Sequence, residues 1–112
     1  MSILCQNTIN SLREATGEVF DMILDTYMKD AQKNVESMIV SSQSHDTDEL
    51  LRLTHTLKGS SRNVGASELA DLCESLEKDL RNGEHSDLDQ RVTNISTSFE
   101  NTLPLLQTYL AQ

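Results

Sequence analysis

The chain has few of the residues that interrupt or brace a fold. It contains no Trp, one Pro and four Gly among 112 residues, and aromatic residues make up only 4% of it. This composition favours helices packed through Leu, Ile, Val and Met, because Pro and Gly are the residues that most disfavour a helix interior. We expect one domain over residues 1–112, since a chain of this length can bury one core.

Basic residues are also scarce. Nine Lys and Arg stand against 18 Asp and Glu, which gives a formal net charge of −9. We therefore expect neither nucleic acid nor an anionic membrane as a partner, because both require a basic face. Cys5 and Cys73 lack CxxC spacing and are expected to be reduced thiols, with Cys73 in the core.

Signals for export or membrane insertion are missing from the sequence. The N-terminus has no basic segment followed by an apolar run, and no stretch approaches the roughly 20 apolar residues of a membrane span. We expect a soluble protein located in the cytoplasm.

Apolar residues recur at steps of three and four along most of the chain, a spacing typical of amphipathic helices. It predicts a short helix over residues 3–15 and four longer helices, with apolar faces within 20–39, 50–64, 69–80 and 88–110. Short connections favour antiparallel neighbours. The predicted fold class is all-α: an antiparallel up-down four-helix bundle with an additional short N-terminal helix.

Individual residues indicate where these helices begin and end. Thr16 is a candidate N-cap for the first long helix, and Asp46 with Glu49 resembles a capping box for the second. Gly65 suits the end of that second helix, because glycine tolerates the left-handed conformation found there. Pro104 is expected to kink or divide the last helix, since it removes a backbone donor.

The helix predicted over residues 50–64 carries a histidine on its polar side. With successive residues rotated by about 100°, His55 lies opposite the apolar stripe. Its neighbours on that side are Leu51, Arg52, Lys58, Gly59 and Arg62. Three cations around one imidazole form a local anion site. A glycine inside a helix costs roughly 0.5–1 kcal/mol relative to Ala, which suggests that something approaches the helix closely at Gly59.

An exposed imidazole beside cations suits a nucleophile that receives a phosphoryl group. Neutral imidazole is available near neutral pH, and Lys58 and Arg62 could stabilise the added negative charge. The other ring nitrogen needs an orienting acceptor, for which Glu77 is the candidate at the border of the next apolar stripe. From periodicity alone, the commoner explanation is a solvated helix face, with Glu77 paired to Arg81.

The string HTLKGSSRNVGASELADLCESLE, residues 55–77, closely resembles the signature of the histidine-containing phosphotransfer (HPt) domains of multistep phosphorelays. The resemblance is strong over residues 50–82 and looser over the segment LREATGEVFDMILDTYMKDAQKNVESM. The fold that it implies is a mainly antiparallel four-helix bundle with an N-terminal helix near one end, which agrees with the bundle predicted from periodicity.

The resemblance also implies roles for individual residues. His55 matches the phosphorylated histidine, Lys58 the lysine beside the phosphoryl group, and Gly59 the small residue that leaves room for a receiver domain. Glu77 falls where many members have Gln or Glu in contact with the active histidine. The family often has Ala at the position of Thr54, which we place at the edge of the core face.

By this resemblance the protein is a phosphorelay intermediate. It would accept a phosphoryl group on His55 from a receiver-domain aspartyl phosphate or a hybrid sensor histidine kinase, and pass it to the Asp of a response regulator. The sequence has no Gly-rich phosphate loop, so we expect a phosphoryl carrier without ATP binding or autokinase activity, and not an enzyme. We expect no cofactor on this chain, with Mg²⁺ on the partner receiver domain, and a monomer. Leu51, Arg52 and Arg62 are the candidate residues for receiver docking and the phosphate environment.

Three alternatives remain open at this point. The first is a docking module of the same fold that binds a kinase or receiver domain without phosphoryl turnover. The second is the phosphoacceptor domain of a chemotaxis-type kinase, phosphorylated by an ATP-binding domain on the same polypeptide. The third is a metal-binding bundle, which the positions of His45, His55 and His85 disfavour because no two are spaced i, i+4.

Overall fold

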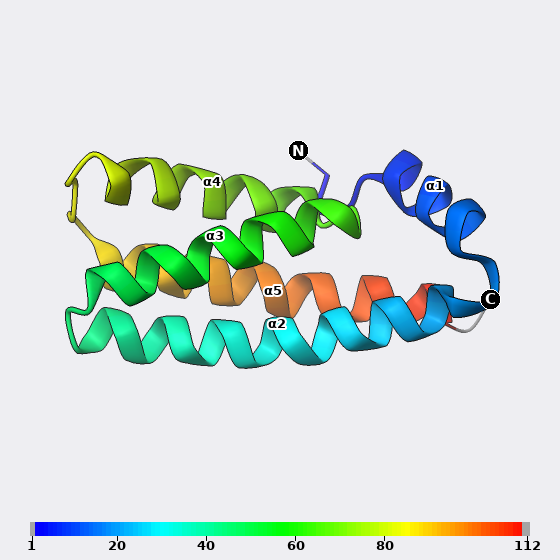
Figure 1. Ribbon diagram of the computed structural model, residues 1–112, viewed down its shortest axis with the longest axis horizontal. Coiled ribbons are helices and arrows are strands. Elements are labelled where there is room, and N and C mark those ends of the chain that lie inside the picture. The colour runs from blue at the N-terminus through cyan, green and yellow to red at the C-terminus, as the bar shows by residue number, and fades with distance from the viewer. Residues whose placement is uncertain (1, 111–112) are drawn as a thin grey trace.

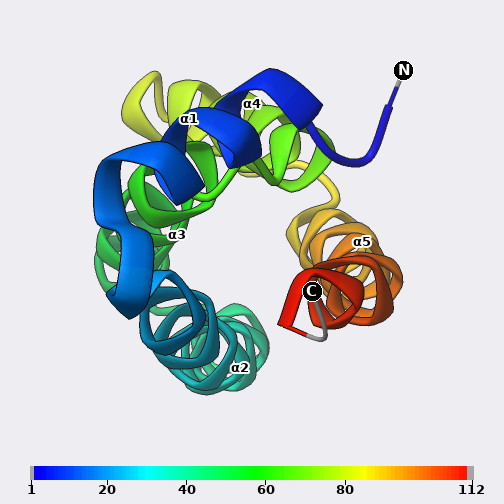
Figure 2. The ribbon, with the colours of Figure 1, turned by 90° about the vertical axis from the view of Figure 1, so that its right-hand side faces the viewer.

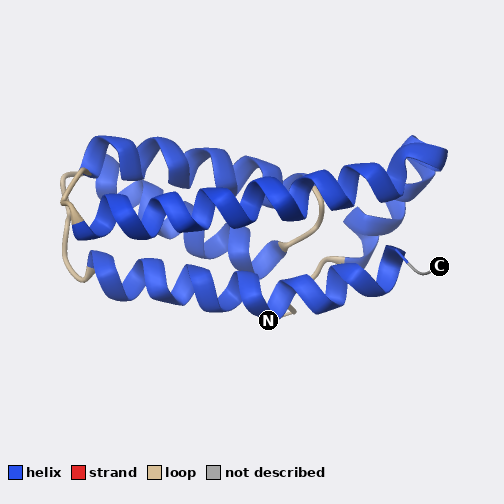
Figure 3. Ribbon diagram, turned by 90° about the horizontal axis from the view of Figure 1, so that it is seen from below, coloured by secondary structure: helices blue, strands red, loops and turns tan. Residues whose placement is uncertain are grey.

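The computed structural model describes residues 2–110, in which four long helices surround one core (Figures 1 and 2). They are α2 (Phe20–Gln43), α3 (Thr47–Asn63), α4 (Ser67–Arg81) and α5 (Leu88–Leu110). Successive helices run in opposite directions, and no strand occurs between residues 2 and 110 (Figures 1 and 3). The predicted all-α, up-down four-helix bundle is confirmed.

The apolar stripes read from the sequence form the core of the bundle. The largest fully buried side chains come from all five α-helices and include Ile9, Leu24, Met38, Leu50, Leu57, Leu69, Leu76, Ile95, Phe99 and Leu106. Full burial of such a side chain stabilises the fold by about 1.5–3 kcal/mol. Cys73 lies in this core as predicted, and burial raises the pKa of its thiol to about 12. Of the helices described, none is both long and apolar enough to cross a bilayer.

A short helix, α1 (Gln6–Thr16), lies across one end of α3 and α4, and the 3₁₀ turn η1 (Gly17–Val19) connects it to α2 (Figure 2). With 24 and 23 residues, α2 and α5 are longer than α3 and α4, with 17 and 15. They therefore extend roughly 10 Å further at one end. The side chain of Ile9, in α1, is fully buried and belongs to the core.

The N-terminal helix begins at Gln6, three residues later than predicted. The segment before it bonds to the α3–α4 turn and to the first turn of α4 instead: Cys5 N–H donates to Gly65 O at 2.7 Å, and Glu68 N–H donates to Ile3 O at 3.3 Å. Gly65 has φ +80°, and a Cβ at this position would lie 2.9 Å from Ile9 Cγ1. Glycine is therefore needed here both for its backbone conformation and for the close approach of α1, and it follows α3 as predicted.

The other helix boundaries confirm some predictions and correct others. Asp46 caps α3 by accepting from Glu49 N–H at 3.1 Å, but the Glu49 carboxylate binds Arg52 and so forms no reciprocal capping box. Thr16 does not cap the next helix, because its hydroxyl donates back to Leu12 O at 2.7 Å. Of the two effects expected of Pro104, a kink or a division of the last helix, the division does not occur. α5 continues through it, and Pro104 is exposed, so the carbonyl left without its helical partner can face water.

Candidate functional site

His55 projects from the middle of α3, away from the core, and its side chain is 59% exposed. The residue before it, Thr54, is fully buried and donates its hydroxyl to Leu50 O at 2.7 Å. Thr54 thus lies in the core and not at its edge as expected. The same helical rotation that buries Thr54 turns the next residue to solvent, which is how the predicted exposure of the imidazole arises.

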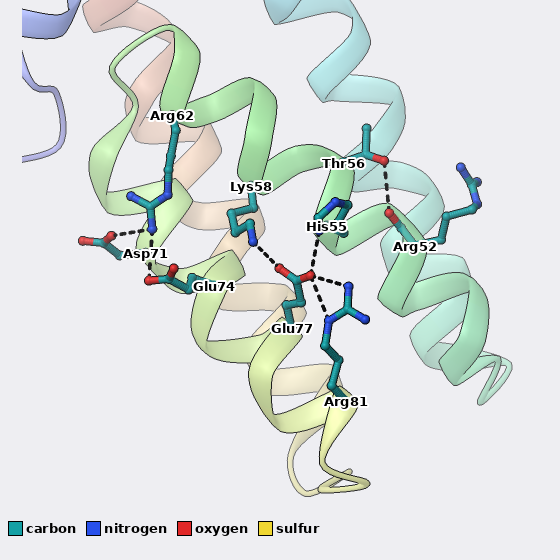
Figure 4. A network of polar contacts seen from close by, with 9 residues as sticks. All are labelled: Arg52, His55, Thr56, Lys58, Arg62, Asp71, Glu74, Glu77 and Arg81. Atoms are coloured by element: carbon teal, nitrogen blue, oxygen red, sulfur yellow. Dashed lines mark hydrogen bonds and ion pairs between the residues drawn. The ribbon is translucent and has the colours of Figure 1, made fainter.

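Glu77 of α4 is the acceptor for this imidazole. His55 Nδ1 lies 2.7 Å from Glu77 Oε2, and Lys58 Nζ lies 2.7 Å from the other oxygen, Oε1. Arg81 also donates to Oε2, from Nη2 at 2.7 Å and from Nε at 3.1 Å. Figure 4 shows these three side chains converging on one carboxylate, whose side chain is only 6% exposed. The carboxylate therefore ties α3 to α4 at the position of His55.

These contacts set the ionisation of Glu77 and the tautomer of His55. Burial alone would raise the pKa of Glu77, but hydrogen bonds from Lys58, Arg81 and His55 outweigh it and hold the pKa at about 2. An ionised carboxylate can only accept hydrogen bonds, so Nδ1 of His55 must be the donor. In the neutral ring the proton is then on Nδ1, and the lone pair is on Nε2.

Two of the three cations predicted around the imidazole bind elsewhere. Arg62 lies 3.4 Å from Asp71 and 3.0 Å from Glu74, both on α4, and Figure 4 shows it pointing to them and not to His55. Arg52 pairs with Glu49 on its own helix. The predicted trio is corrected for a physical reason: in an acidic chain each guanidinium has a carboxylate within reach, and an imidazole offers no negative charge to compete with that carboxylate.

Gly59 and Leu51 lie on the same helix as His55. A Cβ at the exposed Gly59 would meet nothing within 4 Å, so the folded chain itself does not require glycine there. Leu51 is half-buried and packs against the core, which leaves only part of its side chain accessible to a partner.

Arg81 is the site residue that sequence reasoning missed. Its i, i+4 spacing from Glu77 favours an ion pair, but from the sequence this pair was an alternative to a contact between Glu77 and His55. Both form, because a carboxylate has two oxygens and about four positions at which it can accept a hydrogen bond. The i, i+4 spacing thus indicated the pair of Glu77 with Arg81, but only the structure shows that His55 binds the same carboxylate.

The metal-binding alternative has no ligand set in the structure. Among residues 2–110, His, Cys, Asp and Glu form no group of three or more that could hold a metal ion. His45 and His85 lie in the α2–α3 and α4–α5 connections, apart from His55 in the middle of α3.

A four-helix bundle that presents an exposed imidazole from the middle of a helix, anchored through its second nitrogen, has the architecture of a histidine phosphotransfer carrier. Residues 22–112 match the family model described as Hpt domain, and the chain therefore belongs to the Hpt domain family. Proteins of this family are phosphotransfer carriers, not classical enzymes, and interact with receiver domains and kinases in phosphorelays.

Two solved structures are similar to this chain. Histidine-containing phosphotransfer protein B (HptB) from Pseudomonas aeruginosa PAO1 has a TM-score of 0.93 and 27% sequence identity, over 97% of this chain and 95% of that chain. The second structure is that of a rice protein named as a proposed histidine-containing phosphotransfer protein. It has a TM-score of 0.81 and 17% identity, over 98% of this chain and 81% of that chain. The second likeness shows the fold alone. No curated protein sequence matches the chain.

Proposed function

We propose that His55 is the phosphoacceptor of a phosphorelay intermediate. It receives a phosphoryl group from a receiver-domain aspartyl phosphate, such as that of a hybrid sensor histidine kinase, and passes it to the Asp of a response regulator. The observation that carries this proposal is a 59% exposed imidazole whose Nδ1 is held by a buried carboxylate. Family membership supports the carrier function. The donor, the acceptor and the roles of the individual residues are our proposal.

The proposed transfer uses the lone pair on Nε2. This nitrogen attacks phosphorus, the N–P bond forms as the P–O bond to the donor's aspartate breaks, and the electron pair leaves with that carboxylate. Nδ1 keeps its proton, so the phosphorylated ring carries a positive charge, which Glu77 Oε2 stabilises from 2.7 Å. Transfer to the next receiver reverses these steps. The Mg²⁺ for phosphoryl transfer belongs to the receiver domain, and this chain contributes no cofactor.

Lys58 and Gly59 serve the phosphoryl group and the partner, respectively, in this proposal. The ammonium group of Lys58 has three donors on a flexible stem, so it can turn from Glu77 Oε1 to a phosphoryl oxygen. Gly59 faces open space, which a docked receiver domain would occupy. Leu51 and Arg52 are the proposed docking contacts. We leave Arg62 out of the proposed site, because it pairs with Asp71 and Glu74 of α4.

We place this carrier in the cytoplasm as a monomer without ATP binding or autokinase activity. The test is transfer from ³²P-labelled receiver domains to the wild type, to His55→Gln and to His85→Gln. His85 is a matched control, because it is an exposed histidine outside the site. Acid-labile, alkali-stable label should appear on the wild type and on His85→Gln and be absent from His55→Gln.

Other outcomes of this experiment would replace the proposal. Receivers that bind the wild type without transferring label would leave a docking module in its place. Label that reaches His55 only from ATP, through a kinase ATP-binding domain, would indicate the chemotaxis-type phosphoacceptor.

A further inference from the structure

Arg81 ends α4 and directs its guanidinium group back one turn onto Glu77. Nη2 and Nε both donate to Oε2, the oxygen that also accepts from His55 Nδ1. Lys58, from α3, binds the opposite oxygen, Oε1. One buried carboxylate thus has a separate cation on each of its oxygens (Figure 4).

We propose that Arg81 is a positioning residue for phosphoryl transfer: it keeps Glu77 Oε2 on His55 Nδ1 while Lys58 leaves Oε1 to bind the phosphoryl group. This inference rests on the proposed function and assigns a role to a residue that received none from the resemblance. Arg81 acts through Glu77 and does not itself touch the reacting atoms.

The need for a second cation follows from the burial of Glu77. Its side chain is 6% exposed, and a buried carboxylate that loses its counter-charge is strongly destabilised. If Lys58 were the only cation on Glu77, its move towards the phosphoryl group would leave the carboxylate without a counter-charge before the N–P bond has formed and the ring has become positive. Arg81 supplies the compensation independently, so Lys58 is free to change partners.

The geometry also favours Arg81 over Lys58 as the residue that fixes the orientation of the carboxylate. Two N–H groups of one planar guanidinium bind the same oxygen, which restricts rotation of the carboxylate more than a single ammonium does. Arg81 and Glu77 lie one turn apart on the same helix, so the contact does not depend on how α3 and α4 move relative to each other. The side chain of Arg81 is 56% exposed, and the guanidinium therefore remains partly hydrated while bound.

Because the two cations bind different oxygens, their losses should produce different defects. Lys58→Met should slow transfer and leave the Nδ1–H tautomer of His55 intact, since Arg81 still holds Oε2. Arg81→Met should allow the carboxylate to rotate, so that His55 becomes a mixture of Nδ1–H and Nε2–H tautomers. Only the Nδ1–H form has its lone pair on Nε2, so transfer should slow several-fold, in proportion to the Nδ1–H form that is lost.

The experiment records ¹⁵N NMR shifts of the His55 ring in the unphosphorylated full chain, and transfer rates from a labelled receiver domain. The variants are Arg81→Met, Arg81→Lys and Lys58→Met. Arg91→Met is the matched control, because Arg91 binds Asp79 at 2.6 Å and Ser75 at 2.9 Å on another face of α4. Arg81→Lys should restore part of the tautomer and of the rate, since it returns the charge without the fork.

The outcomes separate this inference from the proposed function. A wild-type tautomer and a wild-type rate in Arg81→Met would overturn the role of Arg81. If the wild type accepts no label from any receiver, the proposed function fails, while the NMR spectra still show whether Arg81 controls the tautomer. Circular dichroism checks folding, and Arg81→Gln, which keeps a polar side chain, applies the same two criteria if Arg81→Met does not fold.

Discussion

Two clusters of charged residues join α3 to α4, and they differ mainly in burial. In the first, His55, Lys58 and Arg81 surround Glu77, whose side chain is 6% exposed. In the second, Arg62 pairs with Asp71 and Glu74, whose side chains are 46% and 61% exposed (Figure 4). The contacts of Glu77 with Lys58 and His55 are 2.7 Å long. Those of Arg62 with Asp71 and Glu74 are longer, at 3.4 and 3.0 Å.

The difference shows what burial adds to an ion pair. Exposed pairs such as those of Arg62 are screened by water and contribute about 0–1 kcal/mol. Around Glu77 water is largely excluded, so every hydrogen-bond donor must come from a side chain, and the carboxylate in turn fixes the position of each donor. The first cluster can therefore orient an imidazole, whereas the second holds two helix surfaces together loosely.

The largest expected difference between the clusters is in phosphoryl transfer. Glu77→Ala should slow transfer from a phosphorylated receiver on the order of 10²-fold, because His55 loses the acceptor that sets its tautomer. Glu74→Ala, the matched change in the second cluster, should alter the rate by less than about twofold. Rapid-quench measurement of labelled protein provides both rates. Equal losses in the two variants would show that burial is not the distinguishing property.

The second expected difference appears in acid. The pKa of Glu77 is about 2 in the folded protein, below its ordinary value of 4.5. The ionised carboxylate therefore stabilises the fold above about pH 4.5, and this contribution is lost as pH falls from 4.5 towards 2. A shift of this size corresponds to at most about 3 kcal/mol.

Glu77→Gln removes the titrating group and tests this pH dependence. Urea unfolding between pH 2.5 and pH 7 should show a free energy of unfolding that falls less steeply below pH 4.5 in Glu77→Gln than in the wild type. Parallel profiles for the two proteins would mean that Glu77 is not held ionised by its three partners.

Gly59 lies on α3 between the two clusters. Its replacement by Ala tests whether a partner protein docks closely beside the first cluster. The space around its Cα is open, so Gly59→Ala should stabilise the free protein by about 0.5–1 kcal/mol, the helix-propensity difference. The same variant should slow transfer several-fold, because by our proposal the added methyl group would project towards a docked receiver domain. Thermal unfolding and transfer assays measure the two effects, and a more stable variant with unchanged transfer would exclude close approach at Gly59.

The sequence predicted the features of the two clusters that depend only on which side of one helix a residue occupies. Periodicity placed His55 opposite Leu53 and Leu57, and both of those are buried. It could not assign the partners of Arg62, because these depend on how α4 is rotated and shifted against α3. The turn at Gly65 connects the two helices, and the backbone of Cys5 bonds to it while that of Ile3 bonds to Glu68. The same bonds delayed the start of α1, which no local pattern indicates.

The smallest expected effect is that of removing the cation of the second cluster. Arg62→Met should lower the free energy of unfolding by less than about 1 kcal/mol, and the loss should shrink further in high salt, because both carboxylate partners are exposed. Transfer to His55 should be unchanged. Urea unfolding at low and high ionic strength measures the first effect, with Glu74→Ala as the partner-side control. A clear loss of transfer in Arg62→Met would mean that Arg62 leaves its carboxylates when a phosphoryl group arrives, and the two clusters would then form one site.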